Sequence, residues 1–553
     1  MRKLVITTAV FQLSSGCMAA LDDDPQPAPR QRSGSTHTAQ RRTFYVQASG
    51  DDTRSGQSPA QSWRSLARVN AEVLAPGDRV LFEGGARFEG TLALDSEDSG
   101  TADDPVTIGS FGAGRATLAA GDGDGISITN AEGFVIERLR IAGDWDAQQQ
   151  RGNDGRGVHA IGTESGRRFH FLRLRELEVR GFKWAGIGLY AQPSDERKQS
   201  GFADVELSHC SVHDNGDVGV ISDGPFTYDR GYSHADVRVR ELRVYDNRGL
   251  TSKGSHTGSG IVLADVEDAL VEHTIAHDNG EYNDAAQGGG FGIWAWDATR
   301  VVIQYNEAYH NRSQTADGGG FDLDGGVTDS VLQYNYSHDN DGAGLGLFQF
   351  TSARPFANNR AHYNISQNDG AGVLLWDGNG DMGAVTVAHN VVFGSAPCLT
   401  TYSEIPDALL IDNVFDCHGD KLLDVFAGAG LTLQGNAYWS GDAPLRITWN
   451  AGSDPHTFDN FGAYRDATAQ ERFDGKDTGV YGDPGLVAPG TAGTLDDSQL
   501  LSSLTMYQLR DDSPLIDRAI DPAQFQADLP TRDFFGAGTP RGERRDIGID
   551  ESR

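Results

Sequence analysis

Residues 301–340 read VVIQYNEAYHNRSQTADGGGFDLDGGVTDSVLQYNYSHDN, and two asparagines from the first half of this stretch return in the second half. Asn306 returns as Asn335, and Asn311 returns as Asn340, in both cases after 29 residues. Short apolar stretches separate these asparagines along the chain. A repeat of about 20–35 residues that combines short strands with turns is typical of a solenoid.

The repeat extends in both directions from this stretch. Its spacing shortens from 32 to 23 residues along the chain. This drift favours a β-coil that accepts insertions at its turns, because helical repeats keep their length more strictly. Stacked asparagines can hydrogen-bond one coil to the next, and asparagine tolerates the left-handed conformation of a turn. We therefore interpret the asparagines as a structural ladder in two series: Asn215, Asn247, Asn279, Asn311 and Asn340, and Asn306, Asn335, Asn364, Asn390, Asn413 and Asn436.

The charge balance limits the possible partners of this chain. Its 553 residues include 46 Lys and Arg against 79 Asp and Glu, which gives a net charge of −33. Such a surface repels nucleic acid and anionic lipid, so we expect neither as a partner. The 70 glycines and the hydrophobic content of 38% fit a chain with many tight turns and little helix.

The segment where order is expected to begin carries a recognisable pattern. Thr43-Phe44-Tyr45-Val46 is followed by Ser49-Gly50-Asp51-Asp52 and by the turn Pro76-Gly77-Asp78. These residues resemble the N-terminal cap of secreted right-handed parallel β-helix proteins, the pectate-lyase-like superfamily. Residues 513–517 and 546–550 are similar to the closing segment found after many such helices.

The resemblance implies an all-β protein, a right-handed parallel β-helix solenoid over residues 43–553. It implies an N-terminal cap over 43–105 and a C-terminal wrap or cap over 440–553. It does not select an activity, because this fold hosts lyases, hydrolases, epimerases and adhesins.

Residues 1–17 read as an export signal. Arg2 and Lys3 precede an apolar run, and Gly16-Cys17 resembles a bacterial lipoprotein cleavage box. We expect a lipid on Cys17, a flexible tether over residues 18–42, and an outer-membrane or cell-surface location, with ordinary secretion as the alternative. Only this lipid would contact a membrane, and we expect a monomer. Cys398 and Cys417 fall on neighbouring coils and could pair in an oxidising compartment.

Seven glycines open one strand of successive coils and allow the outward positions to be assigned. The two-residue period of a strand predicts that the second and fourth residues after each glycine face solvent. In this alignment aromatic residues recur at the fourth position, and such a row suits stacking against sugar rings. We predict sugar subsites at these aromatic residues and at Arg312 on an enlarged turn. The alternative for the aromatic row is structural packing beneath a loop or beneath residues 440–500. The aromatic residues are Tyr190, Trp294, Phe348 and Trp376, and the glycines are Gly186, Gly219, Gly260, Gly290, Gly320, Gly344 and Gly372.

Asp322 and Asp324 stand in the middle of this predicted outward face. Two residues apart on one strand, their Cα atoms would lie about 6.5–7 Å apart, and the repulsion of like charges would raise one pKa. A carboxyl pair of this kind suits glycoside hydrolysis. With Asp297 or Asp377 the same pair could instead hold Ca²⁺ through oxygen ligands. Solvated turn carboxylates without a function are the third interpretation.

Three consecutive coils carry enlarged turns beside this face, and these turns bring in further polar residues. Lys253 or His256 could act as the base of a β-elimination. Residues 318–326 resemble the paired-aspartate element of polygalacturonase-type hydrolases, without their Gly-His-Gly and basic motifs. Three hypotheses therefore stand: a polysaccharide hydrolase that uses Asp322 and Asp324, a Ca²⁺-dependent polysaccharide lyase, and a non-enzymatic glycan-binding or adhesive solenoid.

Overall fold

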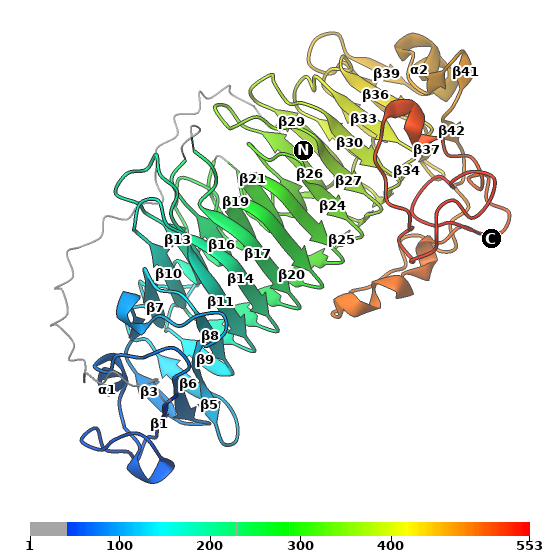
Figure 1. The fold of residues 1–553 in the computed structure, drawn as a ribbon. Coiled ribbons are helices and arrows are strands. Elements are labelled where there is room, and N and C mark those ends of the chain that lie inside the picture. The colour runs from blue at the N-terminus through cyan, green and yellow to red at the C-terminus, as the bar shows by residue number, and fades with distance from the viewer. Residues whose placement is uncertain (1–40, 227–229, 287, 553) are drawn as a thin grey trace.

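The computed structural model describes residues 41–552 except 227–229 and 287. The predicted export signal, the lipidation site Cys17 and nearly all of the predicted tether lie outside the described residues. The chain winds into a right-handed parallel β-helix, with its N-terminal coils at one end and helix α2 (Phe461–Thr468) at the other (Figure 1). Helix α1 (Leu66–Asn70) covers the N-terminal end. Nowhere in the described chain is a helix both long and apolar enough to cross a membrane.

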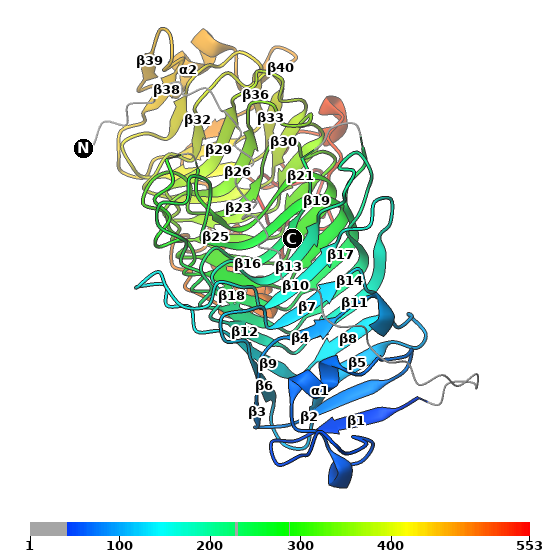
Figure 2. The same ribbon diagram turned by 90° about the vertical axis from the view of Figure 1, so that its left-hand side faces the viewer.

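Three parallel walls make up the coil, and neighbouring strands of walls 1 and 2 are seen side by side in Figure 2. Two long strands, β19 and β21, pass from wall 1 into wall 2 without a break. Wall 1 consists of β4 (Leu92–Leu94), β7 (Ile126–Thr129), β10 (Val158–Gly162), β13 (Ala185–Ala191), β16 (Val218–Asp223), the first halves of β19 (Ser259–Glu272) and β21 (Phe291–Gln304), β23 (Gly319–Leu323), β26 (Ala343–Gln349), β29 (Ala371–Asp377), β32 (Leu399–Thr401), β35 (Leu423–Val425) and β38 (Ile447–Trp449).

Wall 2 follows wall 1 within each coil, and wall 3 closes the coil. Wall 2 consists of β1 (Thr43–Val46), β2 (Arg79–Glu83), β5 (Val106–Phe111), β8 (Phe134–Glu137), β11 (Phe169–Arg175), β14 (Phe202–Ser208), β17 (His234–Arg240), the second halves of β19 and β21, β24 (Val331–Gln333), β27 (Asn359–His362), β30 (Val385–Ala388), β33 (Ala408–Ile411) and β36 (Leu431–Gln434). Wall 3 consists of β3 (Arg87–Glu89), β6 (Ala116–Ala119), β9 (Leu139–Ala142), β12 (Glu178–Arg180), β15 (Ser211–His213), β18 (Arg243–Tyr245), β20 (Ile275–His277), β22 (Glu307–Tyr309), β25 (Tyr336–His338), β28 (Ile365–Gln367), β31 (Val391–Gly394), β34 (Val414–Cys417), β37 (Ala437–Trp439) and β42 (Val480–Tyr481).

Alternation along each strand fills the interior of the coil with apolar side chains. In wall 1, Ile293, Phe321, Leu345 and Val373 oppose one another on successive coils, and all four are fully buried. Burying side chains of this size contributes about 1.5–3 kcal/mol each. Repeating this contribution on every coil stabilises the solenoid along its whole length.

The asparagines form the expected ladders inside the turns. Asn279 Nδ2 donates to Asn311 Oδ1 over 2.9 Å, and Asn335 Nδ2 donates to Asn364 Oδ1 over 3.0 Å. A buried carboxylate accepts the last bond of each ladder: Asp369 from Asn340, and Glu471 from Asn436. The left-handed residue of each turn is the one before the ladder asparagine and not the asparagine itself, as at Asp278, His310 and Tyr334.

The strand-opening glycines leave room for these ladders. A Cβ atom on Gly186 would lie 2.8 Å from Asn215 Nδ2, and a Cβ atom on Gly219 would lie 2.9 Å from Asn247 Nδ2. Any larger residue at these positions would displace the asparagine, since such contacts are closer than van der Waals distance. The recurring glycines and the recurring asparagines therefore belong to one and the same packing contact.

The C-terminal segment, residues 483–552, runs back along the outside of the coil (Figure 1). Asp496 accepts hydrogen bonds from Arg243 of β18, 253 residues earlier, and Arg545 donates to Tyr363. The regular coil reaches β38 and β42, so the wrap begins later than the predicted residue 440. Cys398 and Cys417 form a disulfide between neighbouring coils.

Candidate functional site

The outer face of wall 1 carries an apolar cluster that is separate from the core inside the coil. Its buried members include Phe291, Trp294 and Phe348, and partly buried Trp296 and Trp376 pack against them. Aromatic side chains thus gather on the outward face, as the alternation predicted.

The register of one coil differs from the predicted alignment by two residues. Ile293 opposes Phe321, so Trp294 opposes Asp322, and Gly292 rather than Gly290 is the strand-opening glycine. A Cβ atom on Gly292 would lie 2.8 Å from Asn311 Nδ2, the same contact as in the earlier coils. The predicted placement of Trp294 in one column with Phe348 and Trp376 was therefore wrong.

Trp296 takes that place, and the true column reads Trp296, Asp324, Phe348, Trp376 on successive coils. Phe348 directly opposes Trp376. The predicted aromatics are also less exposed than expected, because Trp294 is only 4% and Phe348 only 6% exposed. Trp294 Nε1 donates to Ser259 Oγ over 3.2 Å, which ties this ring into the wall.

Asp322 is a buried carboxylate in the middle of this face. It is 1% exposed, and its Oδ1 has no hydrogen-bond partner among the described residues. This oxygen lies 2.8 Å from the place that a Cβ atom on Gly346 would occupy. Burial raises the pKa of Asp322 well above its usual range, and the charges of Asp324 and Asp317 raise it further. A carboxyl group in such a place holds its proton.

Asp324 and Asp317 are the more accessible carboxylates, because both are half-buried. Burial raises the pKa of Asp324 to about 7; the Gly325 N–H opposes this shift, and the charge of Asp317 adds to it. Burial raises the pKa of Asp317 to about 6, against a hydrogen bond from the Gly289 N–H at 2.7 Å. The two groups therefore titrate near neutrality and influence each other, as acid and base partners do.

The two predicted bases lie at an earlier coil of the same face. Lys253 Nζ donates to both carboxylate oxygens of Asp217, over 2.8 and 2.7 Å, and to the His256 carbonyl oxygen over 3.1 Å. Its donors are therefore occupied. Burial, and then the charge of Lys253, lowers the pKa of His256 to about 4, and its ring meets Trp294 edge to face at 4.9 Å. In this structure both residues make contacts within the wall, Lys253 with Asp217 and His256 with Trp294.

Asp297 and Asp377, which were predicted as calcium ligands, contact other groups of the protein in this structure. Asp297 forms an ion pair with Arg354 at 2.7 Å. Asp377 accepts hydrogen bonds from the backbone N–H groups of Asn379, Gly380 and Met382. In the described part of the chain, no group of three or more His, Cys, Asp or Glu side chains is arranged to hold a metal ion.

Of the other two predicted subsite residues, Tyr190 lies several coils before the carboxylates, whereas the Arg312 backbone packs against Gly318, next to Asp317. Tyr190 opposes Asp223 near the N-terminal end of the face, where the Arg156 guanidinium lies 4.9 Å from the centre of its ring. Arg312 is exposed on an enlarged turn and lies 3.7 Å from Asp341.

Sequence reasoning missed two aromatic residues of the column, Tyr402 and Phe426. Tyr402 is 47% exposed and Phe426 is 38% exposed. The search for strand-opening glycines stopped before them, because Cys398 stands where the preceding coil has Gly372. Counting from the Leu399 strand instead of from a glycine would have found both.

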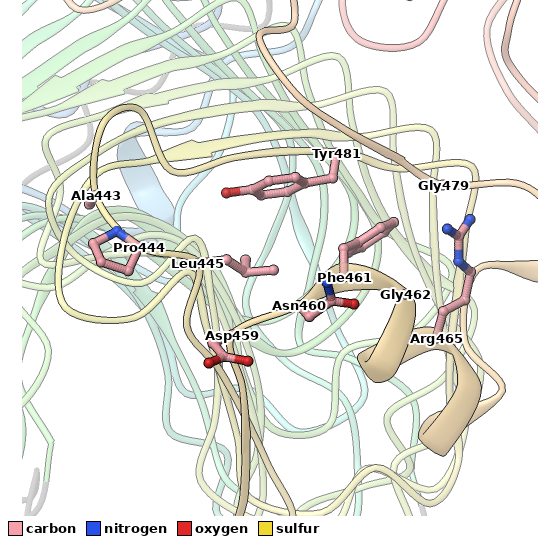
Figure 3. A pocket seen from close by; sticks show the side chains of 10 residues that line it. All are labelled: Ala443, Pro444, Leu445, Asp459, Asn460, Phe461, Gly462, Arg465, Gly479 and Tyr481. Atoms are coloured by element: carbon pink, nitrogen blue, oxygen red, sulfur yellow. The ribbon is translucent and has the colours of Figure 1, made fainter.

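A pocket of about 400 Å³ lies elsewhere, between the turn at residues 443–445 and helix α2 (Figure 3). Tyr481, Phe461 and Arg465 line it together with Asp459. Asp317, Asp322 and Asp324 are not among the residues that line this pocket.

Comparison with known proteins relates the chain to carbohydrate-active relatives. Lacto-N-biosidase of Bifidobacterium longum subsp. longum is 24% identical over 470 residues, which cover 68% of this chain and 29% of that protein. The chain thus spans less than a third of the length of this curated relative. The solved GH136 lacto-N-biosidase of Eubacterium ramulus, as its selenomethionine derivative, has a TM-score of 0.53 and 20% identity over 69% of this chain and 67% of that one. Its native form gives a TM-score of 0.52.

The solved structures show similarity of fold. The family model described as "Right handed beta helix region" matches residues 115–404, which is more than half of the chain. With the three parallel walls, this match shows that the chain belongs to the right-handed β-helix family.

Proposed function

We propose that the protein is a glycoside hydrolase that cuts a glycan bound along the outer face of wall 1. The observation that carries the proposal is the cluster of Asp317, Asp322 and Asp324 beside the aromatic column. The similarity to a relative named lacto-N-biosidase supports the same reaction class. The net charge of −33 favours a neutral glycan.

Two carboxyl groups share the chemistry in such a reaction, one protonated and one ionised. Asp324, with its pKa raised to about 7, serves as the acid that protonates the glycosidic oxygen. Asp317, with the lower pKa of about 6, is the ionised partner and acts on water or on the sugar. The negative charge of Asp317 helps Asp324 to keep its proton.

Asp322 takes a different role from the one predicted for it. At 1% exposure it cannot reach a sugar as readily as its half-buried neighbours. We assign it to positioning, because it lies beneath the face, against Gly346 and Phe348.

The test compares single Asp→Asn variants on a panel of polysaccharides and oligosaccharides, with released reducing ends as the readout. Asp324→Asn and Asp317→Asn should each lower kcat by about 10²–10⁴-fold without a change in thermal unfolding. Asp329→Asn is the matched control, because Asp329 is exposed and has the positive φ of 52° that asparagine tolerates.

Two other outcomes would replace the proposal. An unsaturated product that absorbs in the ultraviolet would identify a lyase. A protein that is retained by glycans but cuts none of the panel would be a binding solenoid.

We further propose that the protein is exported, anchored through a lipid on Cys17, and active as a monomer. The export-signal pattern supports this location, and so does the Cys398–Cys417 disulfide, since disulfides persist in oxidising compartments. Cys17→Ser should move the protein from the membrane fraction to the soluble fraction. Size-exclusion chromatography of the soluble variant tests the monomer.

A further inference from the structure

The aromatic column continues beyond the carboxylates toward the C-terminal coils. Phe348 and Trp376 oppose each other directly. Leu375 opposes Thr401, and Thr401 opposes Val425, so the same register places Tyr402 beside Trp376 and Phe426 beside Tyr402. Starting from Asp324, four successive coils thus each present one ring in the same column.

The rings farther from Asp324 are more exposed than the first ring of the column. Phe348 is buried, Trp376 is half-buried, and Tyr402 and Phe426 are exposed. An exposed row of large apolar side chains costs free energy in water unless a ligand covers it. The C-terminal segment does not relieve this cost for Tyr402 and Phe426, since both keep their exposure in the described protein.

The rings also rest on the backbone at glycine positions. A Cβ atom on Gly378 would lie 2.7 Å from the Trp376 ring, and a Cβ atom on Gly452 would lie 2.2 Å from the Phe426 ring. A ring supported on one side by backbone presents a firm platform to a ligand. This arrangement favours stacking rather than insertion into a partner's pocket.

Polar groups flank the platforms and indicate a hydroxyl-rich ligand. Thr400 and Asp424 oppose each other on the coils of Tyr402 and Phe426. The Asp424 carboxylate accepts from Lys421 Nζ over 2.7 Å, which leaves it further acceptor capacity. An apolar protein partner would leave these groups without water, whereas sugar hydroxyls can bond them.

We propose that Trp376, Tyr402 and Phe426 are consecutive glycan subsites, so that the ligand is an oligosaccharide or polysaccharide chain and not a disaccharide alone. Neighbouring coils lie about 4.8 Å apart, close to the length of one hexose unit, so the coils of Asp324, Phe348 and the three rings take about five units. This inference rests on the proposed function for the cleavage of the glycan, whereas glycan binding at the three rings does not depend on it.

The experiment separates binding from cleavage. Asp324→Asn, alone and with Tyr402→Ala or Phe426→Ala, is run by affinity electrophoresis against a panel of soluble polysaccharides. Each ring loss should weaken the retention constant about two- to twelvefold, since a stacking contact contributes about 0.5–1.5 kcal/mol. Tyr481→Ala is the matched control, because Tyr481 is 37% exposed but lies on β42 of wall 3.

Kinetics give the second readout. In the active protein, Tyr402→Ala should raise KM for a substrate of about four or more units and leave kcat/KM for a disaccharide substrate unchanged. Retention without any cleavage, lost in Tyr402→Ala, would support the subsites and reject the hydrolase. Cleavage that is equally efficient for short and long substrates, with retention unchanged by both ring variants, would overturn the subsites and leave the hydrolase standing. Absence of retention on every polysaccharide would also overturn them.

Discussion

Several columns of aromatic side chains run along the outside of this coil, and two of them have different surroundings. One lies at the turn between walls 2 and 3, where His273, Tyr305, Tyr334, Tyr363 and His389 stack with ring centres 5.0–5.7 Å apart. The other is the wall 1 column from Trp296 to Phe426.

The C-terminal segment covers much of the first column and bonds to it. Tyr334 OH donates to the Arg532 carbonyl oxygen, and Arg545 donates to Tyr363 OH, each over 2.8 Å. Tyr402 and Phe426 of the second column remain exposed. An aromatic row repeating with the coil is therefore not by itself evidence of a ligand site; the presence or absence of a covering segment separates structural stacking from a binding face.

The largest expected effect comes from truncating one ring in each column. Tyr363→Ala should lower the free energy of unfolding by about 3–5 kcal/mol, because a buried ring and its hydrogen bond are lost. Tyr402→Ala should change it by about 0.5 kcal/mol or less, as is usual for a surface position. Urea unfolding followed by circular dichroism measures both. Equal destabilisation by the two variants would remove the distinction between the columns.

A second comparison concerns the carboxyl groups of Glu471 and Asp324, because burial raises the pKa of both. Burial raises the pKa of Glu471 to about 7, against hydrogen bonds from Tyr438 OH at 2.6 Å and from Asn436 at 2.8 Å. The folded protein thus holds this proton more tightly than the unfolded chain, whose glutamate titrates near 4.5. Stability from this group is complete below about pH 4.5 and is lost as the pH rises toward about 7.

Glu471→Gln should therefore remove about 2–3 kcal/mol of the pH dependence of unfolding between pH 4.5 and 7.5. The activity on a cleaved glycan should not change, because Glu471 ends an internal ladder. The measurement is a urea midpoint series across this pH range for both proteins. Parallel curves would show that Glu471 titrates normally and would contradict its placement at the ladder end.

The pH profile of kcat/KM should show the smallest effect, about tenfold per pH unit on each limb. An ionised Asp317 requires a pH above about 6, and a protonated Asp324 requires a pH below about 7. The profile should be bell-shaped with its maximum between these values. A rate that rises steadily to pH 9 would exclude Asp324 as the acid and would favour a base-catalysed elimination.

The fold could be predicted further from the sequence than the site could. Ladder asparagines must repeat with the coil, because each one bonds the next, so spacing alone reveals them. The residues that face outward could also be predicted, because a register error of two residues leaves every side chain on the same face. The register error arose at residues 288–292, which contain four glycines. Of these, Gly292 occupies the strand-opening position.

The burial of the individual carboxyl groups could not be predicted from the sequence. Asp322 and Asp324 look equivalent in the sequence, yet Gly346 and Phe348 on the next coil bury one of them more deeply. Asp317 lies on a turn whose path depends on the Gly289 contact. Such differences come from neighbours about 20–30 residues away, whose register must be known first.

The most direct test of the account is a crystal structure of Asp324→Asn with an oligosaccharide that the protein retains. The account predicts a sugar chain along wall 1, with successive rings over Trp376 and Tyr402 and a glycosidic oxygen beside residue 324. A glycan bound instead in the pocket between residues 443–445 and helix α2, with wall 1 bare, would contradict it.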